Sequence, residues 1–486
     1  MTTLADPGLV RVLGATVIGY VLVMFAIGWW TRSRVHDHED FMVAGRRLPL
    51  HLAWATIVAT WFGAGAMLTA TDTVRAQGLI GAALDPIGAG LCLFLAGWLI
   101  ARPLWEMKLL TLPDFYGRRF GVRTERLSAV LMIPTYFGWI AAQFVALAHL
   151  IEILFGLDVV FGIPLVAIVG MIYTLLGGMW SVTLTDAAQI AVVALGLVVL
   201  TLTVLAELGG GSSLSGLEIL AARTPAPRLS IVPDELPAIV TWLGVVSVGA
   251  LGNLPGQDLT QRIFSARSGR TAVWACHIAG VVYFGLGAFT LVLGLSADLV
   301  APGLASKSTV AMLASLFLSP PLAVLFVLAV MSAVLSTIDS AILSPASVLA
   351  QNLLAPRWPS ADLLRLNRWS VIAVTLVSVA TAYVGESAYS LLESAYELGL
   401  VSLLVPLLMG IRTMVGAERA ALASMIAGTV LWALHFALGW ESFLSPWIDP
   451  LGLPLPMAAS CALCAWAVYL VVARGENERH EHGLVA

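Results

Sequence analysis

The sequence predicts an all-α polytopic membrane protein with about 13 transmembrane helices, built as a five-plus-five inverted repeat with a broken first helix in each half. Hydrophobic residues make up 59% of the 486 residues and charged residues only 11%, and the mean hydropathy is +0.93. This composition excludes a water-soluble fold. Glycines interrupt two long apolar segments, at WFGAGAM (61–67) and GALGNLPG (249–256). Unwound backbone inside a membrane is tolerated where it lines a cavity or binds a ligand, so these paired interruptions indicate a transporter.

Apolar stretches of about 20 residues are long enough to cross a bilayer. The first stretch is too long for the apolar core of a cleaved signal peptide, so we expect it to remain as a helix. The predicted spans are 9–30, 51–78, 80–102, 126–153, 159–178, 184–207, 236–261, 271–296, 321–352, 366–384, 388–411, 418–438 and 451–473. The cysteines lie in apolar runs and are expected to be small packing residues, namely Cys92, Cys276, Cys461 and Cys464.

Basic residues support this topology, because they gather in short cytoplasmic loops of membrane proteins. With the N-terminus outside, 20 of the 25 basic residues fall on the cytoplasmic side, whereas a miscounted helix would invert everything after it. These residues are Arg32, Arg34, Arg46, Arg47, Arg102, Lys108, Arg118, Arg119, Arg123, Arg126, Arg262, Arg267, Arg270, Arg357, Arg365, Arg368, Arg412, Arg419, Arg474 and Arg479. Topology alone accounts for Arg262 in this interpretation, and the C-terminus is cytoplasmic.

A segment rich in Gly, Ser and Pro, about 208–235, separates two blocks of five spans, 51–207 and 236–411. Because five is odd, the second block enters the membrane from the opposite side, as in an inverted repeat. The predicted units are a peripheral helix and loop (1–40), a ten-helix transport core (41–413), two peripheral helices (414–473) and a cytoplasmic tail (474–486).

Five motifs follow one another along the chain. They are FMVAGRRLPLHLAWATIVATWFGAG (41–65), TLPDFYGRRFG (111–121), GGMWSVTLTDAAQ (177–189), GQDLTQRIFSARS (256–268) and MSAVLSTIDSAILSPAS (331–347). Together they resemble the sodium:solute symporter family over about residues 41–411. The resemblance implies a leucine-transporter-like fold and sodium-coupled transport by alternating access.

A sodium ion inside a membrane needs a cage of oxygen atoms, and neutral carbonyls and hydroxyls supply one without burying several negative charges together. Ser336 and Thr337 place adjacent hydroxyls one turn after Ala333, whose carbonyl they can share. The break in the first block is expected to free carbonyls near Ala59 and Phe62. The alternative is that the hydroxyls only bond back to their own helix. The resemblance places the family's common sodium site on these same five residues.

Asp186 and Asp339 are a second pair of candidates, at similar depth near the predicted cytoplasmic boundary. A carboxylate inside the membrane is costly and is a functional candidate by default. Some relatives use the matching aspartate for a second sodium ion, which implies a second cation site at Asp186, Ser336, Asp339 and Ser340. Asp339 departs from the small hydroxyl residue of those relatives. The alternatives are an aspartate bonded to loop backbone or to an inner arginine, and a proton site.

Substrate candidates surround the two breaks. The resemblance to the sodium–sugar symporters places a substrate carboxylate at Asp85, and the alternative is a carboxylate stabilised by the dipole of a helix start. Tyr136 and Trp139 share one face of the fourth span with Gln143, although aromatic residues at helical spacing more often pack than bind. The residues expected to contact the solute are Asp85, Gln143, Asn253, Gln257 and Asp258.

We therefore expect a multi-pass protein of the plasma (inner) membrane that couples inward Na+ flow to uptake of a small polar organic solute by alternating access. The expected partners are the sodium ion, the solute and the lipid bilayer, with no nucleic acid and no obligate protein partner. The alternatives are a proton-coupled symporter on the same fold and a membrane sensor or channel on this scaffold. An enzyme is disfavoured, because no Ser/His pair, paired catalytic Asp or HExxH arrangement emerges.

Overall fold

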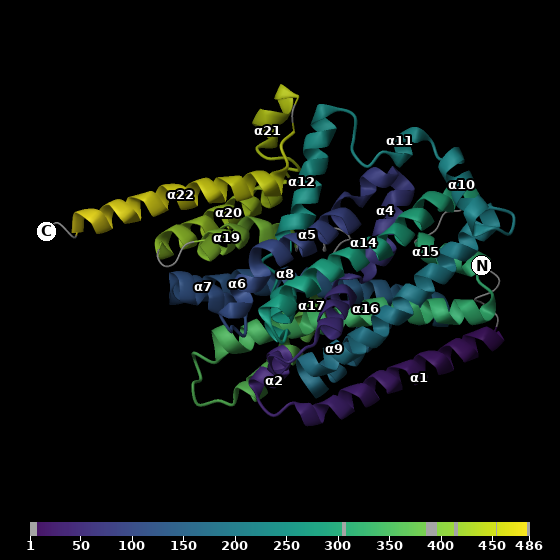
Figure 1. Ribbon diagram of the computed structural model, residues 1–486, viewed down its shortest axis with the longest axis horizontal. Coiled ribbons are helices and arrows are strands. Elements are labelled where there is room, and N and C mark those ends of the chain that lie inside the picture. Colours follow the sequence, from purple (N-terminus) through teal and green to yellow (C-terminus); the bar gives the residue numbers. More distant parts are fainter. Residues whose placement is uncertain (1–6, 304–307, 385–395, 413–416, 453, 484–486) are drawn as a thin grey trace.

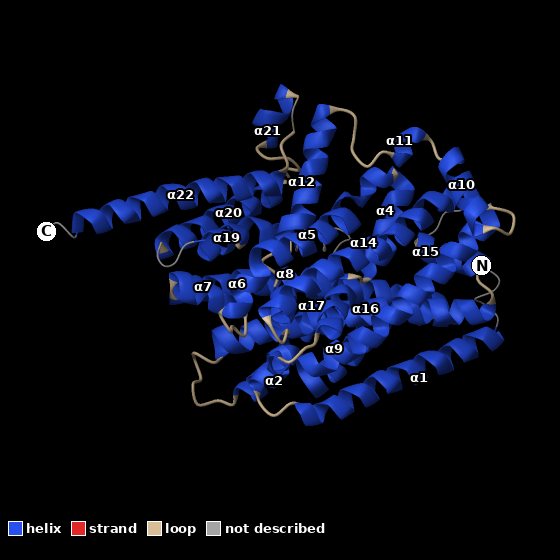
Figure 2. Ribbon diagram, in the orientation of Figure 1, coloured by secondary structure: helices blue, strands red, loops and turns tan. Residues whose placement is uncertain are grey.

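The chain is almost entirely helical in its computed structural model, and the part that the structure describes contains no β-strand (Figure 2). The structure describes residues 7–303, 308–384, 396–412, 417–452 and 454–483. Most helices run in roughly one direction, with α10 and α15 toward one end of the bundle and α2 and α7 toward the other (Figure 1). The end that carries α2 and α7 is the one that the basic loops predict to be cytoplasmic.

Nine helices among the described residues are long and apolar enough to cross a membrane, and two bent helix pairs raise the number to eleven. The nine are α1 (Pro7–Thr31), η4 to α6 (Leu79–Glu106), α8 (Val122–Phe155), α9 (Val159–Leu208), α14 (Gly269–Val300), α16 with η7 (Pro320–Leu354), α17 (Leu363–Val384), α20 (Glu418–Leu438) and α22 (Met457–Gly483). The prediction of a polytopic all-α membrane protein is confirmed.

The two bent pairs are the two predicted broken helices. The first pair begins with α3 (Leu50–Trp61). Its second half is the π-helical turn η3 (Gly65–Thr69), which continues into α4 (Ala70–Gln77), and the two halves meet at 63°. In the second, α12 (Leu236–Gly252) and α13 (Gln257–Ser265) meet at 41°. Both bends fall at the glycine clusters, where the helical hydrogen-bond ladder is interrupted.

Helix α9 covers two predicted spans, 159–178 and 184–207. Its 50 residues would extend about 75 Å as one straight helix, far more than the roughly 30 Å of a hydrocarbon core. The chain breaks at Gly178, whose φ of 50° and ψ of −139° suit glycine, and a Cβ there would lie 2.5 Å from the Phe41 carbonyl oxygen.

The predicted count of thirteen transmembrane helices stays a prediction. Residues 385–395, which enter the predicted span 388–411, lie outside the described residues, and α19 (Leu404–Arg412) closes that span.

Short helices form in several connections where only loops were expected. They are α2 (His38–Val43), α7 (Leu112–Phe120), α10 (Ser213–Arg223), α11 (Ala226–Leu229), α15 (Thr309–Phe317) and α21 (Ser445–Ile448). Side-chain caps explain four of these starts, because Asp37, Thr111, Ser212 and Ser308 each accept a hydrogen bond from a backbone N–H in the first turn. At Thr111 the cap is reciprocal, with the Asp114 carboxylate bonded to the Thr111 N–H.

Helix α16 lies at the centre of the bundle, against α3, α8 and α9, and nearly all of its residues from Val327 to Val348 are buried. Glycines on α9 allow this close packing. A Cβ at Gly170 would lie 2.4 Å from Ile338 Cγ2, and one at Gly196 would lie 2.3 Å from Ala329 Cβ. Small residues let helices approach closely in lipid, where apolar burial gives little driving force between helices. The packing holds the polar face of α16 against the first broken helix.

Candidate functional site

The first helix break frees carbonyl groups that side chains of α16 then contact. Carbonyls in the last turn of a helix have no partner within that helix. The Ser336 hydroxyl lies 2.8 Å from the Ala59 carbonyl oxygen, and the Thr337 hydroxyl lies 2.9 Å from that of Thr60. Two adjacent hydroxyls of α16 therefore meet two successive carbonyls of α3.

Two other elements form hydrogen bonds to backbone groups at the break. The Tyr283 hydroxyl on α14 lies 3.4 Å from the Trp61 carbonyl oxygen. The Ala64 N–H donates to Gln143 Oε1 on α8 at 3.0 Å, where an unbroken helix would have bonded it to the fourth residue before it. Gln143, a substrate candidate, is therefore bonded to the first helix break.

Five oxygen atoms meet beside the break, and we call them the oxygen cluster. They are the carbonyl oxygens of Ala59, Thr60 and Ala333 and the hydroxyl oxygens of Ser336 and Thr337. Each hydroxyl lies 3.0 Å from the Ala333 carbonyl as well as close to one carbonyl of α3. A hydroxyl carries a single proton, so it can donate to only one of its two carbonyl neighbours. The cluster therefore has more acceptor oxygens than protons, which favours a bound cation.

This geometry brings four of the five predicted sodium ligands together, Ala59, Ala333, Ser336 and Thr337. The Phe62 carbonyl makes no hydrogen bond to either hydroxyl, and the Phe62 ring packs edge-on against Tyr283 at 5.4 Å between centroids. The Thr60 carbonyl, which was not among the predicted ligands, takes part as well. Because Ser336 and Thr337 are adjacent, the carbonyls that they contact on the facing helix are successive as well. If Ser336 contacts Ala59, the next carbonyl is that of Thr60. Both hydroxyls also bond to the Ala333 carbonyl of their own helix, as the alternative interpretation of this Ser-Thr pair expects.

A buried arginine, Arg262, connects the two broken helices, so the interpretation that topology alone accounts for this residue at the start of a basic loop is wrong. Its side chain is 1% exposed. The guanidinium donates to Ser340 Oγ at 2.5 Å, to the Asp258 carbonyl at 2.9 Å and to the Thr56 carbonyl at 3.3 Å. Every residue of α13 is buried. Counting charges along the sequence cannot show this burial, so it could not distinguish Arg262 from the basic residues of the loop that follows.

Three residues of the second candidate cation site, Asp186, Asp339 and Ser340, lie around this arginine. Asp186 Oδ2 accepts a hydrogen bond from Thr56 Oγ1 at 2.5 Å and lies 3.8 Å from Arg262 Nη2. Asp339 Oδ1 accepts from Ser340 Oγ at 3.2 Å. The second oxygen of each carboxylate has no hydrogen-bond partner. Arg262 thus links Asp186 to Ser340, which contacts Asp339, and the alternative of a pairing with an inner arginine is realised at Asp186. The second cation site stays a prediction.

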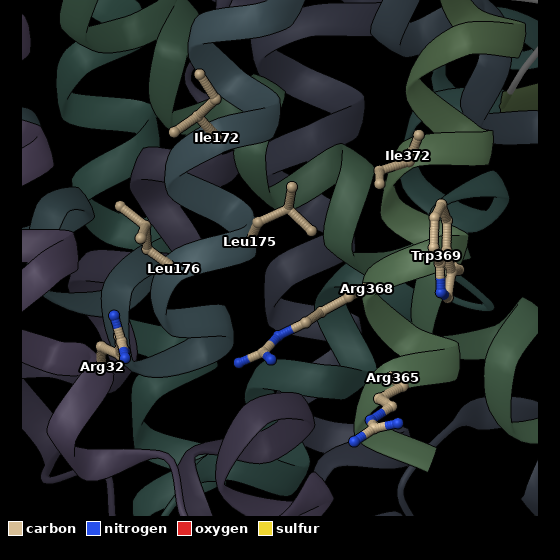
Figure 3. Close-up of a pocket in the computed structure, with 8 residues that line it drawn as sticks. All are labelled: Arg32, Ile172, Leu175, Leu176, Arg365, Arg368, Trp369 and Ile372. Atoms are coloured by element: carbon tan, nitrogen blue, oxygen red, sulfur yellow. The ribbon is translucent and has the colours of Figure 1, made fainter. Parts of the chain in front are cut away.

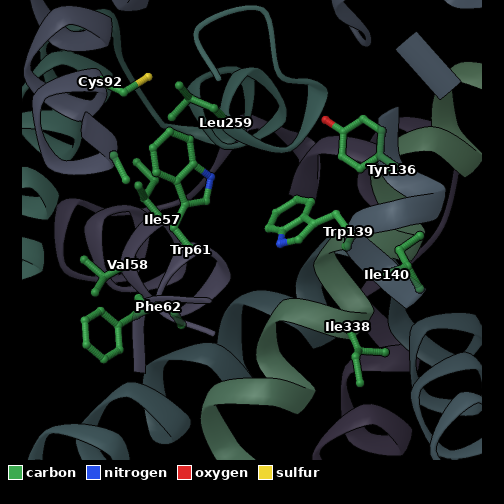
Figure 4. Packing of buried hydrophobic residues seen from close by; sticks show 14 of the residues in the cluster. Ile57, Val58, Trp61, Phe62, Cys92, Tyr136, Trp139, Ile140, Leu259 and Ile338 are labelled. Carbon is green, nitrogen blue, oxygen red and sulfur yellow. The ribbon is translucent and has the colours of Figure 1, made fainter. Parts of the chain in front are cut away.

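Aromatic residues gather beside Asp258 at the second helix break. Figure 4 shows Trp61 projecting from α3, and Tyr136 and Trp139 from α8. Asp258 Oδ2 accepts from Trp61 Nε1 at 2.6 Å, and Oδ1 accepts from the Tyr136 hydroxyl at 2.7 Å. The Asp258 N–H donates to the same hydroxyl at 3.0 Å. These hydrogen bonds to the Asp258 carboxylate come from neutral donors.

A cavity of about 30 Å³ adjoins this carboxylate. Its walls include Tyr136, Trp139, Asn253, Asp258 and Tyr396. This volume holds about two water molecules and is too small for an organic solute. Of the five substrate candidates, Asn253 and Asp258 line the cavity.

The other substrate candidates lie elsewhere. Asp85 is buried in extended backbone and accepts a hydrogen bond from the Tyr283 hydroxyl at 2.8 Å. Its position before Pro86 disfavours helix at that residue, which accounts for the break in the third predicted span. Gln257 Oε1 accepts from the Leu112 N–H at 2.7 Å, so this side chain attaches α13 to α7.

Both ends of the first broken helix are tied to their surroundings. At the predicted cytoplasmic end, the Leu48 N–H donates to the Ser265 carbonyl and the Arg267 N–H donates to the Leu48 carbonyl, each at 3.0 Å. At the other end, Arg75 Nη2 lies 2.7 Å from Asp298 Oδ1, and the Thr309 N–H donates to Asp72 Oδ1. The oxygen cluster lies between these two sets of contacts along the first broken helix.

Two broken helices, with α3 and α13 packed against one face of the central helix α16, are the arrangement of the leucine-transporter-like fold. A Na+-coupled sialic acid symporter, solved in a substrate-bound outward-open state, matches with a TM-score of 0.77 over 95% of this chain and 96% of that chain, at 16% identity. Mhp1, a nucleobase-cation-symport-1 family transporter, matches with a TM-score of 0.56 over 90% and 94%, at 15% identity. At these identities the likeness concerns the fold.

The sodium:solute symporter family matches residues 41–428, and the chain belongs to this family. The human high affinity choline transporter 1 is 28% identical over 366 residues, which are 70% of this chain and 61% of the human protein. The chain therefore spans less than two thirds of that relative. The sodium/proline symporter of Staphylococcus aureus (strain Newman) is 24% identical over 458 residues, which are 89% of this chain and 85% of the bacterial protein.

Proposed function

We propose that the protein is a plasma-membrane symporter that couples inward Na+ flow to uptake of a small organic cation with a substituted ammonium group, such as choline. Transport proceeds by alternating access, with the N-terminus outside, the C-terminus inside and residues 41–413 as the transport core. The observation that carries this proposal is the oxygen cluster. Ala59, Thr60, Ala333, Ser336 and Thr337 supply neutral oxygens for Na+ at the break of the first helix.

Buried charge and aromatic rings support a cationic solute. Asp258 and Asp85 are 5% and 7% exposed, and their carboxylates accept hydrogen bonds from hydroxyl and indole groups. A buried carboxylate without a basic partner is stabilised when a cation binds beside it. The faces of Trp and Tyr rings also attract substituted ammonium groups. The similarity to choline transporters agrees with this chemistry.

Sodium at the oxygen cluster would join α3 to α16, because its ligands come from both helices. Coupling follows if the outward-open state binds Na+ more tightly than the inward-open state, since a ligand shifts an equilibrium only through such a difference. The cavity beside Asp258 must widen beyond its present 30 Å³ to admit the solute. Parting of the contacts between Leu48 and the segment 265–267 would open the cytoplasmic side.

Uptake by purified protein in liposomes tests the proposal. We expect an inward Na+ gradient to drive uptake of labelled choline, and labelled proline and glucose to accumulate far less. Ser336→Ala/Thr337→Val should raise the half-saturating Na+ concentration at least about tenfold, since it removes two oxygens of the cluster. The matched control is Ser247→Ala/Thr381→Ala, whose hydroxyls bond back to their own helices. Equal loss in both variants, or uptake without a Na+ requirement, contradicts the sodium site.

A proton-coupled symporter is the second candidate. Asp186 and Asp339 are fully buried, and each has one carboxylate oxygen without a hydrogen-bond partner. A proton bound at such an oxygen would neutralise the buried charge. Under this mechanism an inward pH gradient drives uptake in Na+-free liposomes, and Asp186→Asn abolishes it. Uptake that follows Na+ and ignores the pH gradient excludes this candidate.

A further inference from the structure

A groove of about 600 Å³ lies on the outer surface of the bundle, away from the central site. Its walls come from the end of α1, from the first half of α9 and from the first turns of α17. Three of its lining residues are arginines, Arg32, Arg365 and Arg368. The others are apolar and include Ile172, Leu176 and Trp369. The groove is thus basic at one part of its wall and apolar along the rest.

The charges and the apolar side chains are separated within the groove. Figure 3 shows Arg32, Arg365 and Arg368 in its lower half, with the guanidinium of Arg368 extending toward the space between the helices. Ile172, Leu175 and Ile372 lie above them. Arg32 directly follows α1, and the other two arginines lie in the first two turns of α17. The arginines therefore lie near the helix ends that the basic loops predict to be cytoplasmic, with the apolar wall reaching into the membrane.

The groove opens toward lipid. Trp369 is 68% exposed and Ile172 is 41% exposed in the protein without a bilayer. Large apolar side chains this exposed on a membrane-spanning helix face acyl chains. An apolar wall beside hydrocarbon and a basic end at the headgroup level suit an amphipathic ligand with a negative head.

We propose that this groove binds an anionic phospholipid of the cytoplasmic leaflet, with its phosphate between the three arginines and an acyl chain along Ile172 and Leu176. A guanidinium has five donors in a planar fork that matches phosphate geometry. The present contacts leave donors free for it. Arg32 stacks over Trp29 at 4.9 Å, and Arg365 lies 3.5 Å from the exposed carboxylate of Asp362. Basic pockets between membrane helices at this depth suit anionic headgroups.

Native mass spectrometry of the full-length protein tests the proposal by titration with dioleoyl phosphatidylglycerol or dioleoyl phosphatidylcholine in detergent. We expect one phosphatidylglycerol to bind in preference to phosphatidylcholine. Each arginine near an anionic headgroup contributes about fivefold in affinity, so Arg32→Gln/Arg365→Gln/Arg368→Gln should weaken that preference on the order of a hundredfold. Soluble glycerol phosphate should not compete, because it cannot use the apolar wall.

The matched control removes the same charge from the same end of the protein. Arg123→Gln/Arg126→Gln/Arg357→Gln alters three exposed arginines outside the groove and should keep the preference. Ile172→Phe/Leu176→Phe fills the apolar wall without a change of charge and should lower phosphatidylglycerol binding. Thermal unfolding confirms that each variant is folded. The proposal is overturned by equal loss in both triple variants, by equal binding of the two lipids, or by competition from glycerol phosphate.

Discussion

Thr337 lies so close to Gly63 that a Cβ at position 63 would be 2.3 Å from the Thr337 hydroxyl oxygen. The same hydroxyl lies 2.9 Å from the Thr60 carbonyl oxygen. The missing side chain at the break therefore lets α16 approach the freed carbonyls of α3. The glycine cluster contributes to the proposed cation site both by ending the helix and by leaving space for the ligand of the facing helix.

Gly63→Ala should therefore weaken Na+ binding. The added methyl group displaces the Thr337 hydroxyl from the oxygen cluster, and overpacking of this kind costs about 1–3 kcal/mol. We expect the half-saturating Na+ concentration for uptake to rise at least about fivefold, since 1.4 kcal/mol corresponds to one decade. Gly285→Ala is the control, because nothing lies within 4 Å of a Cβ at that position. Unchanged Na+ dependence in Gly63→Ala would contradict the placement of the cation.

Tyr136→Phe should weaken solute binding and leave Na+ binding intact. The substitution removes the hydroxyl that donates to the Asp258 carboxylate and accepts from the Asp258 N–H. Hydrogen bonds to charged groups contribute about 1.5–3 kcal/mol, so the KM for choline should rise about tenfold or more. Tyr383→Phe is the control, because its hydroxyl bonds to the Val160 carbonyl far from the cavity. A KM that matches the control would remove Tyr136 and Asp258 from the solute site.

The fold could be predicted further than the site. Apolar lengths and paired glycines are local properties of the sequence, and they located both broken helices. Side-chain partners depend on the register between helices that are distant in sequence, which is why the Thr60 carbonyl was missed. Arg262 shows the same difficulty, because a basic residue near a helix end fits a cytoplasmic loop as well as a buried network. Gln257 is a further example. Its amide oxygen accepts a hydrogen bond from the Leu112 N–H, and only the packing of the helices shows this contact.

Acid should destabilise the connection between α1 and α3 through Asp40, which lies outside the spans. Burial raises the pKa of Asp40, but hydrogen bonds from His36 and Arg47 outweigh it, so the pKa lies below its ordinary value. The ionised carboxylate therefore contributes stability above the unfolded pKa of about 3.9, and the contribution is lost as the pH falls through the folded pKa. Arg47→Gln should move the acid loss of thermal stability to higher pH, and Arg357→Gln should not. Identical acid profiles for the two variants would contradict this role.

Arg262 and Asp186 should be strongly coupled in stability. Removing one partner of a buried charge pair costs about 3–5 kcal/mol, because the other charge is left uncompensated. Arg262→Met should therefore lower the thermal stability markedly, and adding Asp186→Asn should recover part of the loss. Arg102→Met is the control. Arg102 Nε lies 2.9 Å from Glu106 Oε1, both side chains are exposed, and such pairs contribute under about 1 kcal/mol. A double-mutant cycle measures the coupling directly. Additive losses would mean that Arg262 acts through its bonds to Ser340 and the backbone rather than through the charge of Asp186.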